Sequence, residues 1–170
     1  MNELKQHEII SMVIKGLSIV LLILPMYFTV VTVKLSNSNL FSIDLTTISA
    51  NVKLDIALSQ SAQDTIKSSF NSIAFQHMVL TALAILLLII SIFLNYINKR
   101  RSSGVLTIIA GLFTFLLFIR YFVVSSLNGQ AAANLSPNTY VVTFGLGFYF
   151  LTLVTPLLII SALVKFVIKK

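Results

Sequence analysis

The chain of 170 residues has no cysteine, no tryptophan and only three prolines, and charged residues occupy just 10% of its positions. Without cysteine, the protein has no disulfide framework, no thiol nucleophile and no thiolate metal site. That absence excludes the four-span quinone-linked thiol oxidases, which depend on cysteine pairs. An exported loop without disulfides also favours a bacterial cell membrane over an animal cell surface.

Apolar residues, by contrast, make up 57% of the chain, and the mean hydropathy is +0.98. They gather in four runs, at 9–33, 73–97, 105–127 and 140–168. Each run exceeds the roughly 20 residues that a helix needs to cross about 30 Å of hydrocarbon, and the first is too long for the apolar region of a signal peptide. A soluble domain of this composition would expose one large apolar patch. We therefore predict a single four-span membrane domain over residues 1–170.

Basic residues flank these runs on alternating sides. Lys99, Arg100 and Arg101 separate the second run from the third, and further lysines lie near both ends of the chain. The loop 34–72 has lysines that aspartates partly offset, and the loop 128–139 has no charge. Because basic residues stay on the cytoplasmic side, we predict that both termini are cytoplasmic and that the two loops lie outside a cell membrane. The same bias explains the net charge of +7 without nucleic acid, for which the chain has no binding motif.

The first half of the loop 34–72 alternates between apolar and polar residues. Two alternating stretches within Phe41–Leu58 flank a break at Thr47–Asn51, and this pattern predicts a pair of strands. Two further segments, Val30–Leu35 and Tyr140–Thr143, are candidates for additional strands. A two-stranded hairpin is marginal by itself, so we expect it to pack against the other outer segments.

The second half of that loop changes character. Over Ser59–Ser72, apolar residues recur every three or four positions, which predicts a short helix that runs into the second span. The predicted fold class is an all-α four-helix transmembrane bundle with a small extracellular β-sheet cap and a short extracellular helix.

Arg120 is the least expected residue of the third run, about one turn from its outer end. A charge inside a membrane indicates a functional site, here one that binds a ligand or a lipid headgroup, although a long basic side chain near a helix end can also reach the headgroups or form a structural ion pair. Candidate ion-pair partners are the aspartates of the outer loop, namely Asp44, Asp55 and Asp64. His77 opens the second run near the same interface, where a structural role and a pH-sensing role both remain open.

Prolines and glycines inside the runs predict local backbone features. Pro25 and Pro156 each remove a helix hydrogen bond and are expected to kink the first and fourth spans. Gly111, Gly145 and Gly147 provide small surfaces for close helix packing, within one chain or between two copies. No acidic residue lies within the runs and no catalytic constellation is readable, so we predict no enzyme activity, no cofactor and no metal site.

The order of the predicted elements resembles that of claudin-like tetraspan proteins. The polar start of the second span at Phe75–Met78, the third span at Gly104–Leu112 and the Gly-x-Gly-aromatic start of the fourth span at Phe144–Tyr149 are similar to that group. The first loop lacks the group's Gly-Leu-Trp motif and cysteine pair, so the resemblance implies the architecture and not a barrier or paracellular channel. Small four-span proteins of Gram-positive bacteria are similar too.

The function that we expect is interaction rather than chemistry. The protein would sit in the lipid bilayer and bind a protein, peptide or lipid through its extracellular loops, or assemble with itself or into a larger membrane complex. One alternative is an immunity protein against a membrane-active peptide. Another is a lipid-modifying enzyme or transporter with an outer-interface site at Arg120 and His77.

Overall fold

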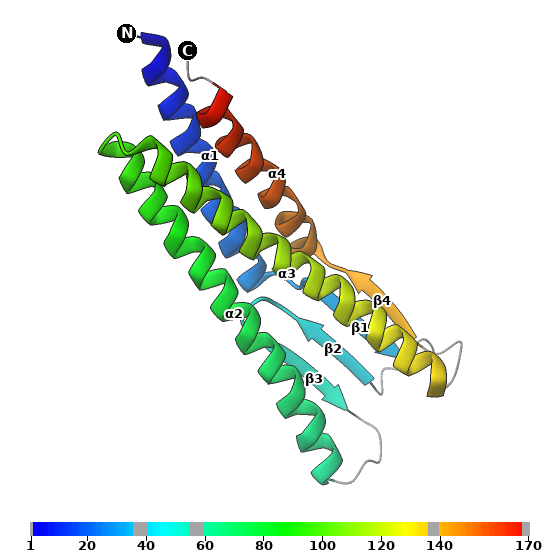
Figure 1. The fold of residues 1–170 in the computed structure, drawn as a ribbon. Helices are drawn as coiled ribbons and strands as arrows, with labels where there is room; N and C mark the ends of the chain where they lie inside the picture. The colour runs from blue at the N-terminus through cyan, green and yellow to red at the C-terminus, as the bar shows by residue number, and fades with distance from the viewer. Residues whose placement is uncertain (1, 36–40, 55–59, 136–139, 168–170) are drawn as a thin grey trace.

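The structure is a computed structural model that describes residues 2–35, 41–54, 60–135 and 140–167. Helices dominate it, and a small antiparallel sheet accompanies them (Figure 1). Both termini and the connector between the second and third helices lie at one end of the molecule, which we call the connector end. The sheet lies at the opposite end, which we call the sheet end. The elements in chain order are α1 (Asn2–Tyr27), β1 (Val31–Leu35), β2 (Phe41–Leu45), β3 (Ala50–Leu54), α2 (Gln60–Tyr96), α3 (Arg100–Leu135), β4 (Tyr140–Phe144) and α4 (Leu146–Val167).

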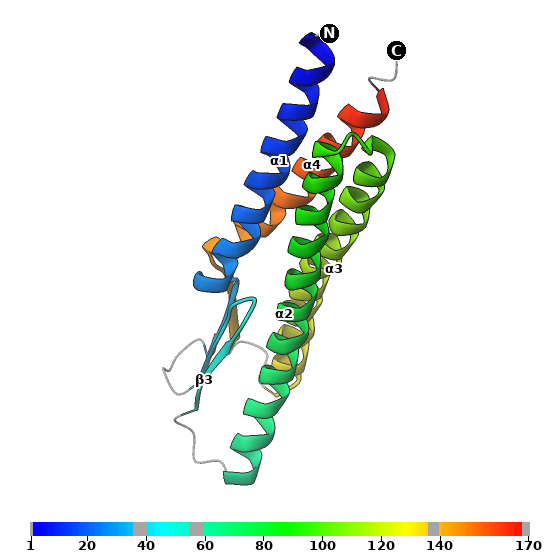
Figure 2. The ribbon, with the colours of Figure 1, turned by 90° about the vertical axis from the view of Figure 1, so that its left-hand side faces the viewer.

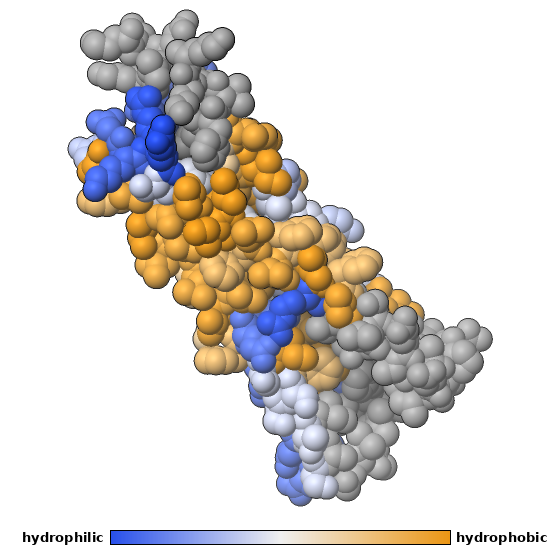
Figure 3. Space-filling model, in the orientation of Figure 1, coloured by the Kyte–Doolittle hydropathy of each residue, from blue (hydrophilic) through white to orange (hydrophobic). Residues whose placement is uncertain are grey.

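Four helices are long and apolar enough to cross a membrane, as the sequence predicts. The qualifying segments are Gln6–Tyr27, Gln63–Tyr96, Arg100–Val123 and Leu146–Leu163. Their outward side chains are mostly apolar, and Figure 3 shows them as a band across the bundle between more hydrophilic ends. In water this apolar band would be unfavourably exposed. The hydrocarbon of a lipid bilayer solvates the same side chains without that cost.

The element bounds differ from the predicted runs at three places. The run 9–33 divides into α1 and β1, and the run 140–168 divides into β4 and α4, because strands continue the apolar pattern beyond the helix ends. Helix α3 continues to Leu135, so most of the predicted loop 128–139 is helical. The predicted short helix before the second span is the first part of α2.

The sheet has the strand order β3-β2-β1-β4, and every neighbouring pair is antiparallel. The predicted hairpin is β2 and β3, joined by a turn in which Thr46 N–H donates to Ser49 O at 2.9 Å. Strand β3 begins at Ala50, within the predicted break, and residues 55–58 of the predicted second strand lie outside the described residues. Strand β1 pairs on its other edge with β4, with Val31 opposite Phe144 and Leu35 opposite Tyr140. Both candidate additional strands are therefore confirmed.

The sheet takes the place of α1 and α4 alongside the extended ends of α2 and α3. Helices α1 and α4 stop where the sheet begins, while α2 and α3 continue beside it (Figures 1 and 2). Helix α2 contacts β3, and α3 contacts β1 and β4. The side chains on the inner face of the sheet join the core of the bundle, among them Val31, Val33, Ile43 and Leu45, all buried.

A tight corner lies where α1 leads into β1 and where β4 leads into α4. Gly145 N–H donates to Val30 O at 3.0 Å, and Gly147 N–H donates to Thr29 O at 3.0 Å. A Cβ atom on Gly147 would lie 2.7 Å from Phe28 O, and one on Gly145 would overlap the carbonyl of Thr29. Only glycine lets the start of α4 approach the backbone at the end of α1 this closely.

The connector between α2 and α3 is short because α2 ends in a compact cap. Asn98 has φ 62°, Asn98 N–H donates to Asn95 O at 3.1 Å, and Lys99 N–H donates to Leu94 O at 2.9 Å. These two bonds with a left-handed residue between them form a Schellman cap, in which asparagine is the common substitute for glycine. The basic residues after it are thereby held at the connector end.

Candidate functional site

The strongest candidate site lies where the bundle meets the sheet, between α2 and α3. Arg120 on α3 donates from Nη2 to Oε1 of Gln76 on α2. Because a guanidinium only donates, this contact assigns the carbonyl oxygen of Gln76 to Arg120 and leaves its amide N–H groups as donors. Arg120 is half-buried and Gln76 is exposed, so the pair lies on the surface of the bundle.

One residue further along each helix, a second pair points inward. His77 and Tyr121 are both fully buried, and their ring centroids are 4.2 Å apart. The Tyr121 hydroxyl donates to Thr46 O at 3.0 Å, in the turn between β2 and β3. The site is therefore two layers deep, with a polar pair outside and an aromatic pair inside that ties the helices to the sheet.

Two buried residues at this site, His77 and Thr47, have side-chain polar atoms without hydrogen-bond partners among the described residues. Neither imidazole nitrogen of His77 has a hydrogen-bond partner among the described residues, and neither does the hydroxyl of the buried Thr47. Buried polar groups without partners destabilise a fold by about 1–3 kcal/mol each. The backbone N–H of Thr47 donates to Pro25 O at 3.1 Å, and this bond attaches the β2–β3 turn to the end of α1.

The three predicted aspartate partners do not pair with Arg120 where the structure describes them. Asp44 Oδ1 accepts a hydrogen bond from Thr32 Oγ1 at 2.6 Å, across the β1–β2 pair. Asp64 is exposed on α2. Asp55 lies outside the described residues. Gln76 is the partner that the aspartate prediction missed, since only the facing of α2 and α3 brings it to Arg120.

The predicted packing residues have varied surroundings. Pro25 lies in the last turn of α1, and Pro156 is exposed within α4. Gly145 and Gly147 serve the corner between α1 and α4 rather than a flat helix face. Gly111 instead lines an apolar groove of about 270 Å³ between α3 and α4, where a Cβ would meet only Leu158 Cβ at 3.8 Å.

A buried polar network near the connector end is absent from the predicted sites. Lys15 on α1 is fully buried, and its Nζ donates to Ser91 Oγ at 2.7 Å and to Ser103 Oγ at 2.8 Å. Ser91 also bonds Thr107 Oγ1 at 2.9 Å, so the network joins α1, α2 and α3. The i, i+4 spacing of Ser103 and Thr107 is a signal that could have indicated a shared polar face.

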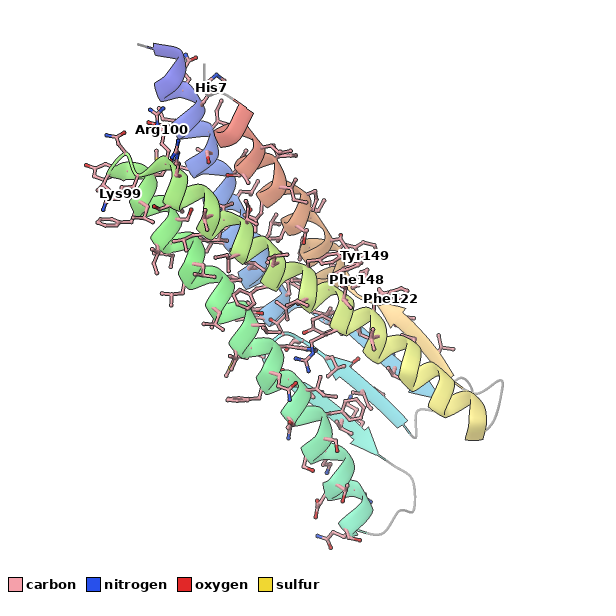
Figure 4. The ribbon with its side chains drawn as sticks, in the orientation of Figure 1. His7, Lys99, Arg100, Phe122, Phe148 and Tyr149 are labelled. Carbon is pink, nitrogen blue, oxygen red and sulfur yellow. The ribbon has the colours of Figure 1, made fainter. Side chains whose placement is uncertain are left out.

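Contacts of Glu8 with Arg100 and Asn95 join α1 to α3 and α2 at the connector end. Glu8 pairs with Arg100, and Asn95 Nδ2 donates to Glu8 O at 3.3 Å. Figure 4 shows Arg100 there with His7 and Lys99, far from Phe122, Phe148 and Tyr149, which lie toward the sheet end. His7 thus lies at the connector end, whereas His77 contacts Tyr121 where the bundle meets the sheet.

The outer face of the sheet, opposite to α2 and α3, is polar on β1, β2 and β3, and Val141 of β4 adds an exposed apolar side chain next to Lys34. Lys34, Ser42 and Lys53 form one cross-strand row over β1, β2 and β3. Both lysines are exposed. Thr32, Asp44, Asn51 and Thr143 form the adjacent row. Among the described elements, none covers this face (Figure 2).

Within the described part of the chain, no group of three or more metal-binding side chains comes together. Comparison with known proteins adds no assignment, since no family model matches this chain and no curated protein matches its sequence. The geometry of the two ends and of the sheet is thus the basis for a functional proposal.

Proposed function

We propose that this chain is a non-enzymatic integral membrane protein that binds a protein or peptide through the outer face of its sheet. The observation that carries the proposal is the open polar row of Lys34, Ser42 and Lys53, on a sheet whose other face is fixed to the bundle. A rigid surface loses little conformational entropy on binding, which favours affinity. Two exposed lysines on it favour a partner with acidic side chains.

The proposed orientation places the sheet outside the cell membrane and both termini in the cytoplasm. It is supported by Lys99, Arg100 and Arg101 at the connector end, with further lysines in the two terminal segments. The architecture that we propose is claudin-like, with a sheet formed by the first outer loop and a strand that precedes the fourth helix. Assembly with a second copy or into a larger complex is compatible with the same surface.

The test compares charge reversals at the sheet end. The double variant Lys34→Glu/Lys53→Glu changes the open face, whereas Lys67→Glu reverses an exposed charge on α2 and serves as the matched control. A photo-crosslinking residue at Ser42 reports the partner directly, and the same residue at the outward-facing Ile89 reports background.

We expect a discrete adduct from Ser42 that disappears in the double variant and persists with Lys67→Glu. The proposal fails if Ser42 gives no adduct beyond that of Ile89 in cells, or if both reversals weaken the adduct equally. The proposal would also be weakened if the protein purifies from mild detergent as a monomer without a partner and cells with the double variant behave as cells with the wild type do.

A further inference from the structure

Arg120 lies one hydrocarbon thickness away from Arg100 on the same helix. Helix α3 is continuous over both residues, and twenty positions at about 1.5 Å each separate them by about 30 Å. Arg100 pairs with Glu8 at the connector end, outside the apolar band. If that pair lies at one headgroup level, Arg120 lies at the other.

A ring of aromatic side chains marks the same level independently. Each of the four helices has an aromatic residue that is more than half exposed near the sheet end, namely Tyr27, Phe75, Phe122 and Tyr149. Tyrosine rings gather at membrane interfaces because they are amphipathic, so Tyr27 and Tyr149 indicate the headgroup level on α1 and α4. Phe75 adjoins Gln76 in sequence and Phe122 is close to Arg120, so the polar pair lies within this ring.

The Arg120–Gln76 pair offers mainly donors, because the Gln76 carbonyl oxygen already accepts from Arg120. One guanidinium N–H group bonds Gln76, and the described residues include no carboxylate paired with Arg120. The free amide hydrogens of Gln76 add to the remaining guanidinium donors. A phosphate group matches this arrangement, because its oxygens accept the parallel N–H bonds of an arginine fork together with further donors.

An apolar strip leads away from the pair toward the middle of the bundle. Val79 and Leu83 follow Gln76 on α2 at helical spacing, and Leu116 precedes Arg120 by one turn on α3. All three are more than a third exposed. Figure 3 shows a hydrophilic patch over α2 and α3 at the sheet-side edge of the apolar band. A ligand with a phosphate and an acyl chain would contact both surfaces at once.

We propose that Arg120 and Gln76 bind the phosphate of a membrane phospholipid, with an acyl chain along Val79, Leu83 and Leu116. The inward pair of His77 and Tyr121 packs α2 against α3 directly beneath the polar pair. The site is separate from the outer face of the sheet, so its test does not depend on a protein partner.

The experiment measures lipid binding to the full chain, purified in detergent and stripped of lipid. Native mass spectrometry follows the first bound phosphatidylglycerol as its concentration rises, for the wild type and for Arg120→Gln, Arg120→Lys and Gln76→Leu. The matched control is Arg101→Gln, which removes an exposed arginine at the connector end. Diacylglycerol, which has the chains without phosphate, and inorganic phosphate, which has no chain, separate the two halves of the ligand.

We expect Arg120→Gln to weaken the first binding event by at least about tenfold, since charge-assisted hydrogen bonds contribute that much. Arg120→Lys should fall between this variant and the wild type, because a lysine keeps the charge and loses the fork. Arg101→Gln should bind as the wild type does, and diacylglycerol should bind weakly and equally to all variants.

Equal phosphatidylglycerol binding by Arg120→Gln and the wild type would overturn the proposal, as would an equal loss in Arg101→Gln. Inorganic phosphate that binds as tightly, with the same dependence on Arg120, would show a site for a free anion instead of a lipid. If Arg120→Gln does not elute as a single folded species, Arg120→Lys and Gln76→Leu decide the matter, and wild-type binding by both refutes the site.

Discussion

Replacing Gly147 by alanine tests the corner that joins α4 to the end of α1. The new Cβ would lie 2.7 Å from Phe28 O and 2.9 Å from Val30 Cγ2, both closer than real Cβ contacts allow. Relieving them requires the start of α4 to move by several tenths of an ångström, which weakens the 3.0 Å bond from Gly147 N–H to Thr29 O. Overpacking costs about 1–3 kcal/mol and the lost bond about 1 kcal/mol, while alanine recovers up to about 1 kcal/mol of helix propensity.

We therefore expect Gly147→Ala to lower the free energy of unfolding by about 1–3 kcal/mol. Two glycines provide controls of the opposite sign. Gly16 has nothing within 4 Å of an added Cβ, and Gly111 has only an ordinary contact at 3.8 Å. Alanine at either position should be neutral or stabilising, by up to about 1 kcal/mol.

The assay is the melting midpoint of a fluorescent-protein fusion, measured by size-exclusion chromatography after heating in detergent. Trypsin cleavage after Lys34 and Lys53 reports separately whether the sheet has loosened from the bundle. Gly147→Ala should melt below the wild type and be cleaved faster, whereas Gly16→Ala should do neither. A Gly147→Ala protein as stable and as protease-resistant as Gly16→Ala would refute the close approach at this corner.

Substitutions at Ser91, His77 and Asn98 test other parts of the bundle by the same melting assay. Ser91→Ala should destabilise the protein by about 1 kcal/mol more when Lys15 is present than in a Lys15→Met background, because only in the first case does a buried ammonium lose one of its acceptors; equal effects in both backgrounds would contradict the network. His77→Leu should leave stability unchanged or raised, since it removes two unpartnered buried nitrogens, and a loss above about 2 kcal/mol would show that the imidazole has a partner. Asn98→Gly should preserve stability and Asn98→Val should cost about 1 kcal/mol or more, because φ is 62° there; the reverse order would exclude the Schellman cap.

The sheet could be predicted because period-two alternation at residues 41–45 and 52–54 is unlike the neighbouring spans. The helix ends were harder, since hydropathy reports burial in hydrocarbon and not the backbone hydrogen bonds that end a helix. Helix α3 continues past Leu127 to Leu135 through alanines, which favour helix without being strongly apolar. Hydropathy likewise does not separate α1 from β1 within the run 9–33, because both elements are apolar.

The candidate site was predicted only in part, because its residues become neighbours through tertiary packing. Arg120 and His77 stand out in an apolar sequence, whereas their partners Gln76 and Tyr121 do not. Which helix faces which decides those contacts, and one-dimensional spacing contains no information about it. Lys15 illustrates the same limit, since its serine partners lie on two other helices.

The pairing of β1 with β4 also has a consequence for biosynthesis. Strand β1 ends at residue 35 and β4 begins at residue 140, so more than a hundred residues must be translated before the last strand exists. At about 5–20 residues per second this takes roughly 5–20 s. During that interval the hairpin of β2 and β3 can form with β1, while the far edge of β1 keeps unpaired N–H and C=O groups that invite pairing with another chain. The nascent protein is therefore most exposed to misassembly just before its fourth helix enters the membrane.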